Sequence, residues 1–220
     1  MKDKEILHDL QTKFGENILD ASPFPKAYCP GGIENVKAIY LGCDPSNKHS
    51  TKLRCAFAHE SDLPVFKQFI NKHSKQVENI GLSWDTVYTQ NLCRNYFAKE
   101  TTNNISLWKK AAKDYWIDKL VEELNSLFPL NIPVLMSSQH LLEVLGINGF
   151  EKIKAPEFYE CKRSLAIPAD SNKLGRDLIP LYRGKNPNFN ISYSLENKEW
   201  KNYKKQGAIK TKINESPTTA

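Results

Sequence analysis

The chain has 220 residues, of which 40% are hydrophobic, and its 31 lysines and arginines exceed its 25 aspartates and glutamates to give a net charge of +6. This length is enough to bury the core of one globular domain, and no stretch approaches the roughly 20 apolar residues that a membrane span needs. The five cysteines have no paired spacing, which argues against a disulfide framework and against a zinc or iron–sulfur site.

The amino-terminal residues are charged and amphipathic and contain no signal-peptide core, and we interpret the cysteines as reduced. We therefore expect a cytoplasmic protein. Helical periodicity and strand-like apolar runs alternate along the chain. Helices are predicted over 3–14, 62–76, 106–128 and 137–146, and strands over 36–42, 86–91, 132–136 and 177–182.

This alternation predicts an α/β fold in which a central four-stranded parallel sheet lies between two layers of helices. Residues 1–200 form the single predicted domain. Residues 201–220 form a basic, flexible tail, because five lysines and no acid lie between 201 and 212; subtracting them from +6 leaves +1 for the rest of the chain. The tail either contacts nucleic-acid phosphates or is a solvated end.

The first predicted strand ends in an unusual way, with Gly42, Asp44 and Pro45 following the apolar run. In open α/β sheets, ligands bind outside the carboxyl ends of the strands. Proline restricts the backbone of the aspartate before it, and glycine permits a close approach of a ligand. The alternative is an ordinary Asp-Pro turn, which is common at strand ends.

The segment "ENVKAIYLGCDPSN" resembles the first motif of the uracil-DNA glycosylase superfamily, a strand that enters Gly-Gln-Asp-Pro-Tyr-His. The family's base-stacking phenylalanine follows the aspartate by 13 residues, and Phe57 follows Asp44 by 13 residues. Asn91 in "TVYTQNLCRNY" matches the asparagine that reads the uracil edge, and Trp108 in "NNISLWKKAAKDYW" matches the family's tryptophan. With "NIPVLMSSQHLLEVLG" as the third strand and its helix, the likeness covers about residues 33–190.

The resemblance implies that Asp44 is the carboxylate beside the scissile bond and that Phe57 stacks on an extruded base. Asn91 would hydrogen-bond the edge of that base, with Gly42, Cys43 and Ser46 completing the pocket. Each residue also has an ordinary structural interpretation: Phe57 as a core aromatic side chain and Asn91 as a cap of a turn.

The chain departs from the family pattern at several positions. Ser46 stands in place of the tyrosine that excludes thymine, Asn47 in place of the next histidine, and Val65 falls near a phosphate-binding serine. In "LIPLYRGKNPNF", Arg183 aligns with the catalytic histidine. Its guanidinium could face the negative charge of a departing base, or it could contact a phosphate or lie on the surface.

The loop after Arg183 is expected to contact DNA through Lys185, Asn186 and the wedge residue Phe189. We therefore expect a monomeric DNA glycosylase of base excision repair, acting on uracil or a related damaged base in single- or double-stranded DNA. The alternative is a catalytically degenerate module that keeps the fold and binds nucleic acid. No metal or cofactor is expected, because the five histidines lack metal-ligand spacing and no glycine-rich phosphate loop occurs.

Overall fold

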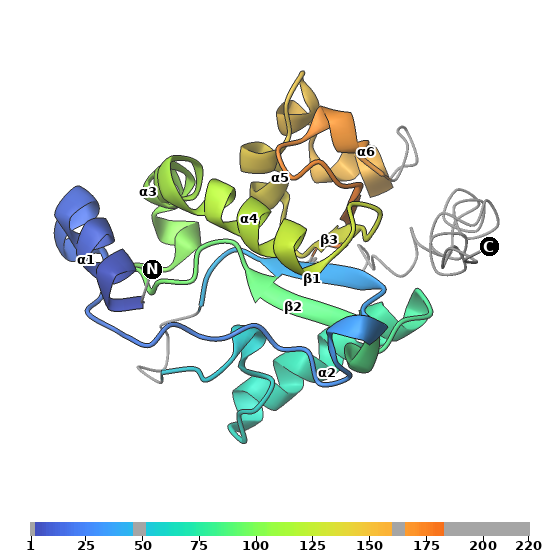
Figure 1. The fold of residues 1–220 in the computed structure, drawn as a ribbon, viewed down its shortest axis with the longest axis horizontal. Coiled ribbons are helices and arrows are strands. Elements are labelled where there is room, and N and C mark those ends of the chain that lie inside the picture. Colours follow the sequence, from blue (N-terminus) through green and yellow to red (C-terminus); the bar gives the residue numbers. More distant parts are fainter. Residues whose placement is uncertain (1–2, 46–51, 160–165, 183–220) are drawn as a thin grey trace, which may run out of the picture.

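A four-stranded parallel sheet lies at the centre of the chain in the computed structural model, which describes residues 3–45, 52–159 and 166–182 (Figure 1). The strands are β1 (Ala38–Gly42), β2 (Val87–Asn91), β3 (Val134–Met136) and β4 (Leu178–Pro180), in the order β2-β1-β3-β4. All pairings are parallel, and every strand residue is buried. The four predicted strands and the parallel α/β sheet are thus confirmed.

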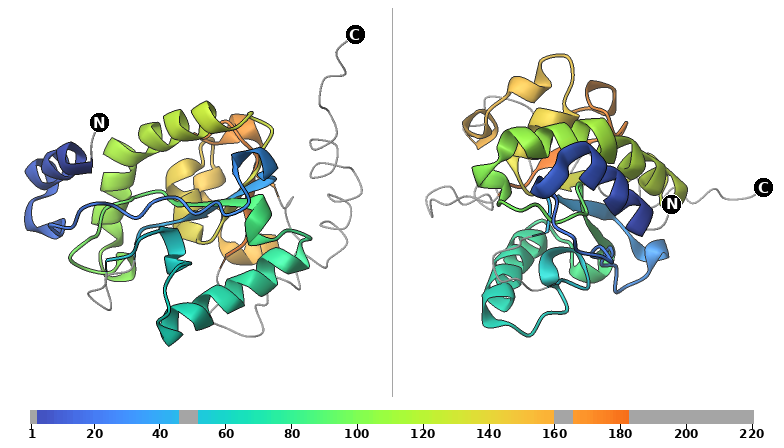
Figure 2. Two further views of the ribbon diagram at one scale, coloured as in Figure 1. Left: turned by 60° about the horizontal axis from the view of Figure 1, so that its bottom comes forward. Right: turned by 90° about the vertical axis from the view of Figure 1, so that its left-hand side faces the viewer.

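Helices cover both faces of the sheet (Figures 1 and 2). α2 (Pro64–Asn79) lies on one side, and α3 (Ile105–Ala111), α4 (Ile117–Leu127) and α5 (Gln139–Leu145) lie on the other. α1 (Asp3–Phe14) comes before the sheet in the chain, and α6 (Ala155–Tyr159) comes between β3 and β4. The predicted helices over 3–14, 62–76 and 137–146 are confirmed to within a few residues, whereas α6 was not predicted.

The helix predicted over 106–128 differs from a regular α-helix, because a π-helical turn (Ala112–Trp116) separates α3 from α4. Its apolar residues recur at intervals of four, and in an α-helix of 3.6 residues per turn such a row drifts around the axis. The wider π turn takes up part of this drift. As a result Trp108, Trp116 and Leu124 are all buried although they span both helices.

A buried arginine fastens the segment before β4 to the end of α4. The guanidinium of Arg176 is fully buried and donates to the main-chain carbonyls of Leu124 (3.0 Å), Phe128 (2.8 Å) and Pro129 (2.5 Å). It also donates to Oδ1 of Asn125 at 3.0 Å. These carbonyls belong to the carboxyl end of a helix, where the macrodipole favours a cation.

Within the described ranges, no helix combines the length and the apolar character that a membrane crossing requires. Among the described residues, Cys29, Cys43, Cys55 and Cys93 form no disulfide bond with one another. The predicted basic tail, residues 201–220, lies outside the described residues.

Candidate active site at the carboxyl edge of the sheet

The carboxyl ends of β1 and β2 lie side by side, with Gly42 opposite Asn91. The contact continues beyond the strands, because the amide of Leu92 donates to the Gly42 carbonyl at 2.8 Å and that of Cys93 to the Cys43 carbonyl at 2.9 Å. This edge is where parallel sheets place their ligands. Two of the segments singled out in the sequence, after β1 and at the end of β2, therefore meet at a plausible binding edge.

Asp44 lies two residues after the end of β1 and is partly exposed. Its Oδ1 accepts a hydrogen bond from Oγ1 of Thr101, which lies in the loop before α3. The indole N–H of Trp108 donates to the neighbouring carbonyl of Cys43 at 3.4 Å. The loop and helix that follow β2 therefore hold both residues at the exit of β1.

Phe57 has a backbone conformation that a bulky residue rarely adopts, with φ 58° and ψ 11°. Ala58 also has a positive φ, of 57°. Such left-handed residues cost about 1–3 kcal/mol each and cluster at functional sites. The ring lies 5.2 Å from that of Tyr40 and 6.0 Å from that of Phe69, measured between centroids, and Phe57 remains partly exposed. Phe57 therefore has core neighbours on one side while the strained backbone presents it at the edge of the sheet.

Gly42 is the point at which the site residues converge. A Cβ atom built on Gly42 would lie 2.5 Å from Cζ of Phe57 and would also overlap Oδ1 of Asn91. Ordinary Cβ contacts are at 3.4–4 Å, so only glycine leaves room for both side chains. The ring of Phe57 and the carboxamide of Asn91 thus contact the same small area of β1, two residues before Asp44.

Asn91 is buried, and a chain of hydrogen bonds supports its backbone from the other face of the sheet. Its amide N–H donates to Oε1 of Gln90 at 2.9 Å, and Nε2 of Gln90 donates to Oε1 of Glu123 on α4 at 3.0 Å. The hydroxyl of Tyr88 donates to the same Glu123 oxygen at 2.6 Å. Burial, followed by the charge of Glu123, raises the pKa of Tyr88 well above its usual range, so the phenol stays protonated as a donor.

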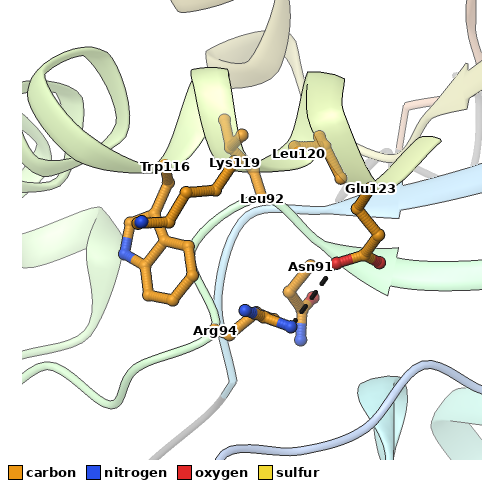
Figure 3. A pocket seen from close by; sticks show the side chains of 7 residues that line it. All are labelled: Asn91, Leu92, Arg94, Trp116, Lys119, Leu120 and Glu123. Atoms are coloured by element: carbon orange, nitrogen blue, oxygen red, sulfur yellow. Dashed lines mark hydrogen bonds and ion pairs between the residues drawn. The ribbon is translucent and has the colours of Figure 1, made fainter. Parts of the chain in front are cut away.

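Figure 3 shows a small pocket beside this network, where Arg94 forms an ion pair with Glu123 at 3.4 Å. The guanidinium of Arg94 also lies 5.1 Å from the ring centre of Trp116. The cavity has a volume of about 10 Å³, roughly the room of one water molecule, and is lined by Asn91, Leu92, Arg94, Trp116, Lys119, Leu120 and Glu123. Ligand pockets usually hold about 300–1,000 Å³, so we interpret this hollow as packing around the Glu123 network.

No protein-family model and no curated protein matches this chain. Of the predicted residues, the structure brings Gly42, Phe57 and Asn91 together and places Asp44 two residues beyond Gly42.

The thiol of Cys43, predicted to line the base pocket, packs in the hydrophobic core. Ser46 in the pocket, Arg183 as the catalytic cation, and Lys185, Asn186 and Phe189 in the DNA-contacting loop lie outside the described residues.

The described histidines nearest to the site are aromatic packing partners. His59 stacks on Tyr28 with a centroid distance of 4.2 Å, and burial lowers its pKa to about 4, so its imidazole is neutral. Nδ1 of His73 lies 2.5 Å from the hydroxyl of Tyr40, behind Phe57. Across residues 3–45, 52–159 and 166–182, no group of three or more His, Cys, Asp or Glu side chains is arranged to hold a metal ion.

Three supporting residues were not found from the sequence. Thr101 is 57 positions from Asp44, so no local pattern could link the two. Gln90 and Glu123 offered a weak indication, since a glutamine in a buried strand and a glutamate beside Leu124 on an inward helix face each need a polar partner.

Proposed function

We propose that this chain is a DNA glycosylase of the uracil-DNA glycosylase type, which hydrolyses the N-glycosidic bond of uracil or a related damaged base. The observation that carries the proposal is the convergence of Phe57 and Asn91 on Gly42, with Asp44 following the same strand. The four-stranded parallel sheet with this edge is the arrangement that the sequence resemblance implies.

The base would leave the DNA stack and lie against the ring of Phe57. Stacking of a base on an aromatic side chain is worth about 1–3 kcal/mol and accepts any base. The carboxamide of Asn91 would supply selection, because it offers a donor and an acceptor on one side chain, as the edge of uracil requires. Since the ring and the amide both contact Gly42, a base stacked on Phe57 has its edge near Asn91.

Asp44 would stabilise the cationic sugar that forms as the bond breaks and would orient the attacking water, as carboxylates do in glycoside hydrolysis. The base departs as an anion, which needs preorganised hydrogen-bond donors and not a general acid. We assign this stabilisation to Arg183, whose permanent charge suits it. Ser46 is smaller than the family's tyrosine, so the pocket should also accept uracils that carry a substituent at position 5.

A second candidate is a catalytically degenerate module that keeps the fold and binds nucleic acid, and Val65 is a described departure from the pattern of an active family member. This side chain is 45% exposed in the first turn of α2, near the position where the family has a phosphate-binding serine. An apolar side chain cannot donate a hydrogen bond to a phosphate, so the grip on DNA must differ there.

The deciding experiment is cleavage of a single-stranded oligonucleotide that contains one uracil, with alkaline scission to reveal abasic sites. Wild-type protein should produce abasic sites, and Asp44→Asn should reduce the rate by at least about 100-fold. Asp118→Asn, at an exposed position of α4, is the matched control and should keep full activity. Binding of the oligonucleotide without cleavage by wild-type protein would support the inactive module and overturn the enzyme.

A further inference from the structure

Two neighbouring residues at the exit of β1 are held by the same stretch of chain. The hydroxyl of Thr101 donates to Oδ1 of Asp44, and the indole N–H of Trp108 donates to the carbonyl of Cys43 at 3.4 Å. One contact fixes a side chain and the other fixes the main chain just before it. Together they restrict both the position and the direction of the Asp44 carboxylate.

The loop that carries Thr101 is itself anchored to the amino-terminal part of the chain. The amide of Leu19 donates to the carbonyl of Tyr96 at 3.0 Å, and the amide of Ala98 donates to the carbonyl of Asn17 at 2.9 Å. These two bonds tie the stretch after β2 to the segment that follows α1. These hydrogen bonds therefore fix the position of the chain just before the turn at Thr101.

The turn at Thr101 is closed by its own main-chain hydrogen bonds. The amide of Asn103 donates to the carbonyl of Glu100 at 2.8 Å, and that of Asn104 donates to the carbonyl of Thr101 at 3.1 Å. Asn104 then leads into α3, where its carbonyl accepts from the amide of Trp108 at 3.1 Å. A short, hydrogen-bonded segment thus connects Thr101 and Trp108. Together these two residues contact Asp44 and Cys43, which follow β1.

The direction of the hydrogen bond follows from the chemistry of the two groups. An ionised carboxylate only accepts hydrogen bonds, so the Thr101 hydroxyl is the donor. A donor that points at a carboxylate favours its charged form, and such charge-assisted bonds are roughly twice as strong as neutral ones. The charged form is also the one that can face a cationic sugar.

We propose that Thr101 is a positioning residue of the active site, which orients the Asp44 carboxylate and keeps it ionised for the reaction. This inference rests on the proposed glycosylase function, because it assigns Thr101 a part in that chemistry. Cys93 is a titratable neighbour of Asp44: burial, and then the charge of Asp44, raise the pKa of its thiol, so Cys93 stays neutral. The neutral thiol supplies no positive charge, and as a weak hydrogen-bond donor it does not replace the Thr101 hydroxyl.

The test compares Thr101→Val, which keeps the shape and loses the donor, with Thr101→Ser, which keeps the hydroxyl. Thr101→Val should lower kcat on uracil-containing DNA on the order of 10- to 100-fold with little change in KM, as expected for a lost hydrogen bond to a charged group. Its acid limb in the rate profile should move to higher pH. Thr101→Ser should keep most of the wild-type kcat, and its acid limb should stay near the wild-type pH.

Thr102→Val is the matched control, because Thr102 is exposed in the same turn, and its kcat and pH profile should stay at wild-type values. NMR titration of the Asp44 carboxyl carbon in wild-type and Thr101→Val protein measures the effect of the Thr101 hydrogen bond on the carboxylate and requires no turnover. If wild-type protein cleaves no base but the titration differs between the two, the proposed function fails and the Thr101 contact stands. Equal titrations, or an active Thr101→Val with an unmoved acid limb, would overturn the inference.

Discussion

Gly42→Ala is the smallest change that tests whether the candidate site is built as described. The added methyl group would lie 2.5 Å from Cζ of Phe57, whereas ordinary Cβ contacts are at 3.4–4 Å, so the ring must retreat by roughly 1 Å. It would also displace Oδ1 of Asn91. Gly42 lies within β1, so alanine brings no backbone strain and the effect is steric.

The expected loss of unfolding free energy is about 1–3 kcal/mol, the usual range for overpacking a buried position. We expect the loss of activity to be more pronounced than the loss of stability. A displacement of about 1 Å can cost on the order of 100-fold in rate, and here both of the groups proposed to contact the base move at once. Urea denaturation gives the stability of the variant, and cleavage of a uracil-containing oligonucleotide gives its kcat and KM.

Gly175→Ala separates this effect from the general cost of replacing a glycine. Gly175 has a φ of +62° and open space where a Cβ would be, so its replacement strains the backbone without touching the site. We expect about 1–2 kcal/mol of destabilisation and unchanged kcat. If Gly42→Ala kept its kcat within about threefold of wild type, Phe57 and Asn91 would not be the base-contacting pair.

Three further changes test the supports of the fold and of the site. Arg176→Met should lower the free energy of unfolding by at least about 3 kcal/mol in urea denaturation, because it leaves several buried carbonyls without their donor; a loss under 1 kcal/mol would contradict the anchoring role. Burial alone would raise the pKa of Glu143, but hydrogen bonds from His140, Lys109, Gln139 and Lys154 outweigh it and hold that pKa well below its usual range. The stability that this depressed pKa contributes is complete above the pKa of the unfolded state, near 4.3, and is lost as pH falls below it. Glu143→Gln should therefore flatten the acid side of a Tm–pH curve. An unaltered slope would count against a stabilising role of these hydrogen bonds. Gln90→Leu should reduce kcat on the order of 10-fold, since the Asn91 amide loses its acceptor, while equal activity would remove Gln90 from the support of Asn91.

Much of the fold was predictable because its causes are local. β1, β3 and β4 are short apolar runs buried on both faces. α2 follows from apolar spacing, and α5 follows from apolar spacing and from its cap, since Ser138 Oγ accepts from the amide of His140 at 3.3 Å. The π turn at Ala112–Trp116 was not predictable in the same way. A row of apolar residues at intervals of four fits a drifting α-helix and an interrupted one equally well, and contact with the sheet decides between them.

The candidate site was predictable only in part, because its supports come from distant segments. Asp44 and Gly42 stand out at the end of one strand, whereas the partner of Asp44, Thr101, is 57 positions away. Glu123 lies 33 positions from Gln90 and reaches it only because α4 packs across β2. The positive φ of Phe57 is also invisible in the sequence, since the surroundings of the residue and not its type impose that conformation.

The three proposed functional groups have separate supports, so a change at one of them leaves the supports of the others in place. Phe57 is backed by Tyr40 and Phe69 on the α2 side of the sheet, whereas the backbone of Asn91 is held through Gln90 from the α4 side. Asp44 is held by Thr101 from the loop before α3. Gly42 is the shared contact of Phe57 and Asn91. Apart from Gly42, each of the three groups is held by different residues. If the proposed function holds, we therefore expect substitutions at Ser46 or Arg183 to change which base is accepted and how its departing charge is stabilised, while the Asp44 carboxylate, the Phe57 ring and the Asn91 carboxamide keep their places.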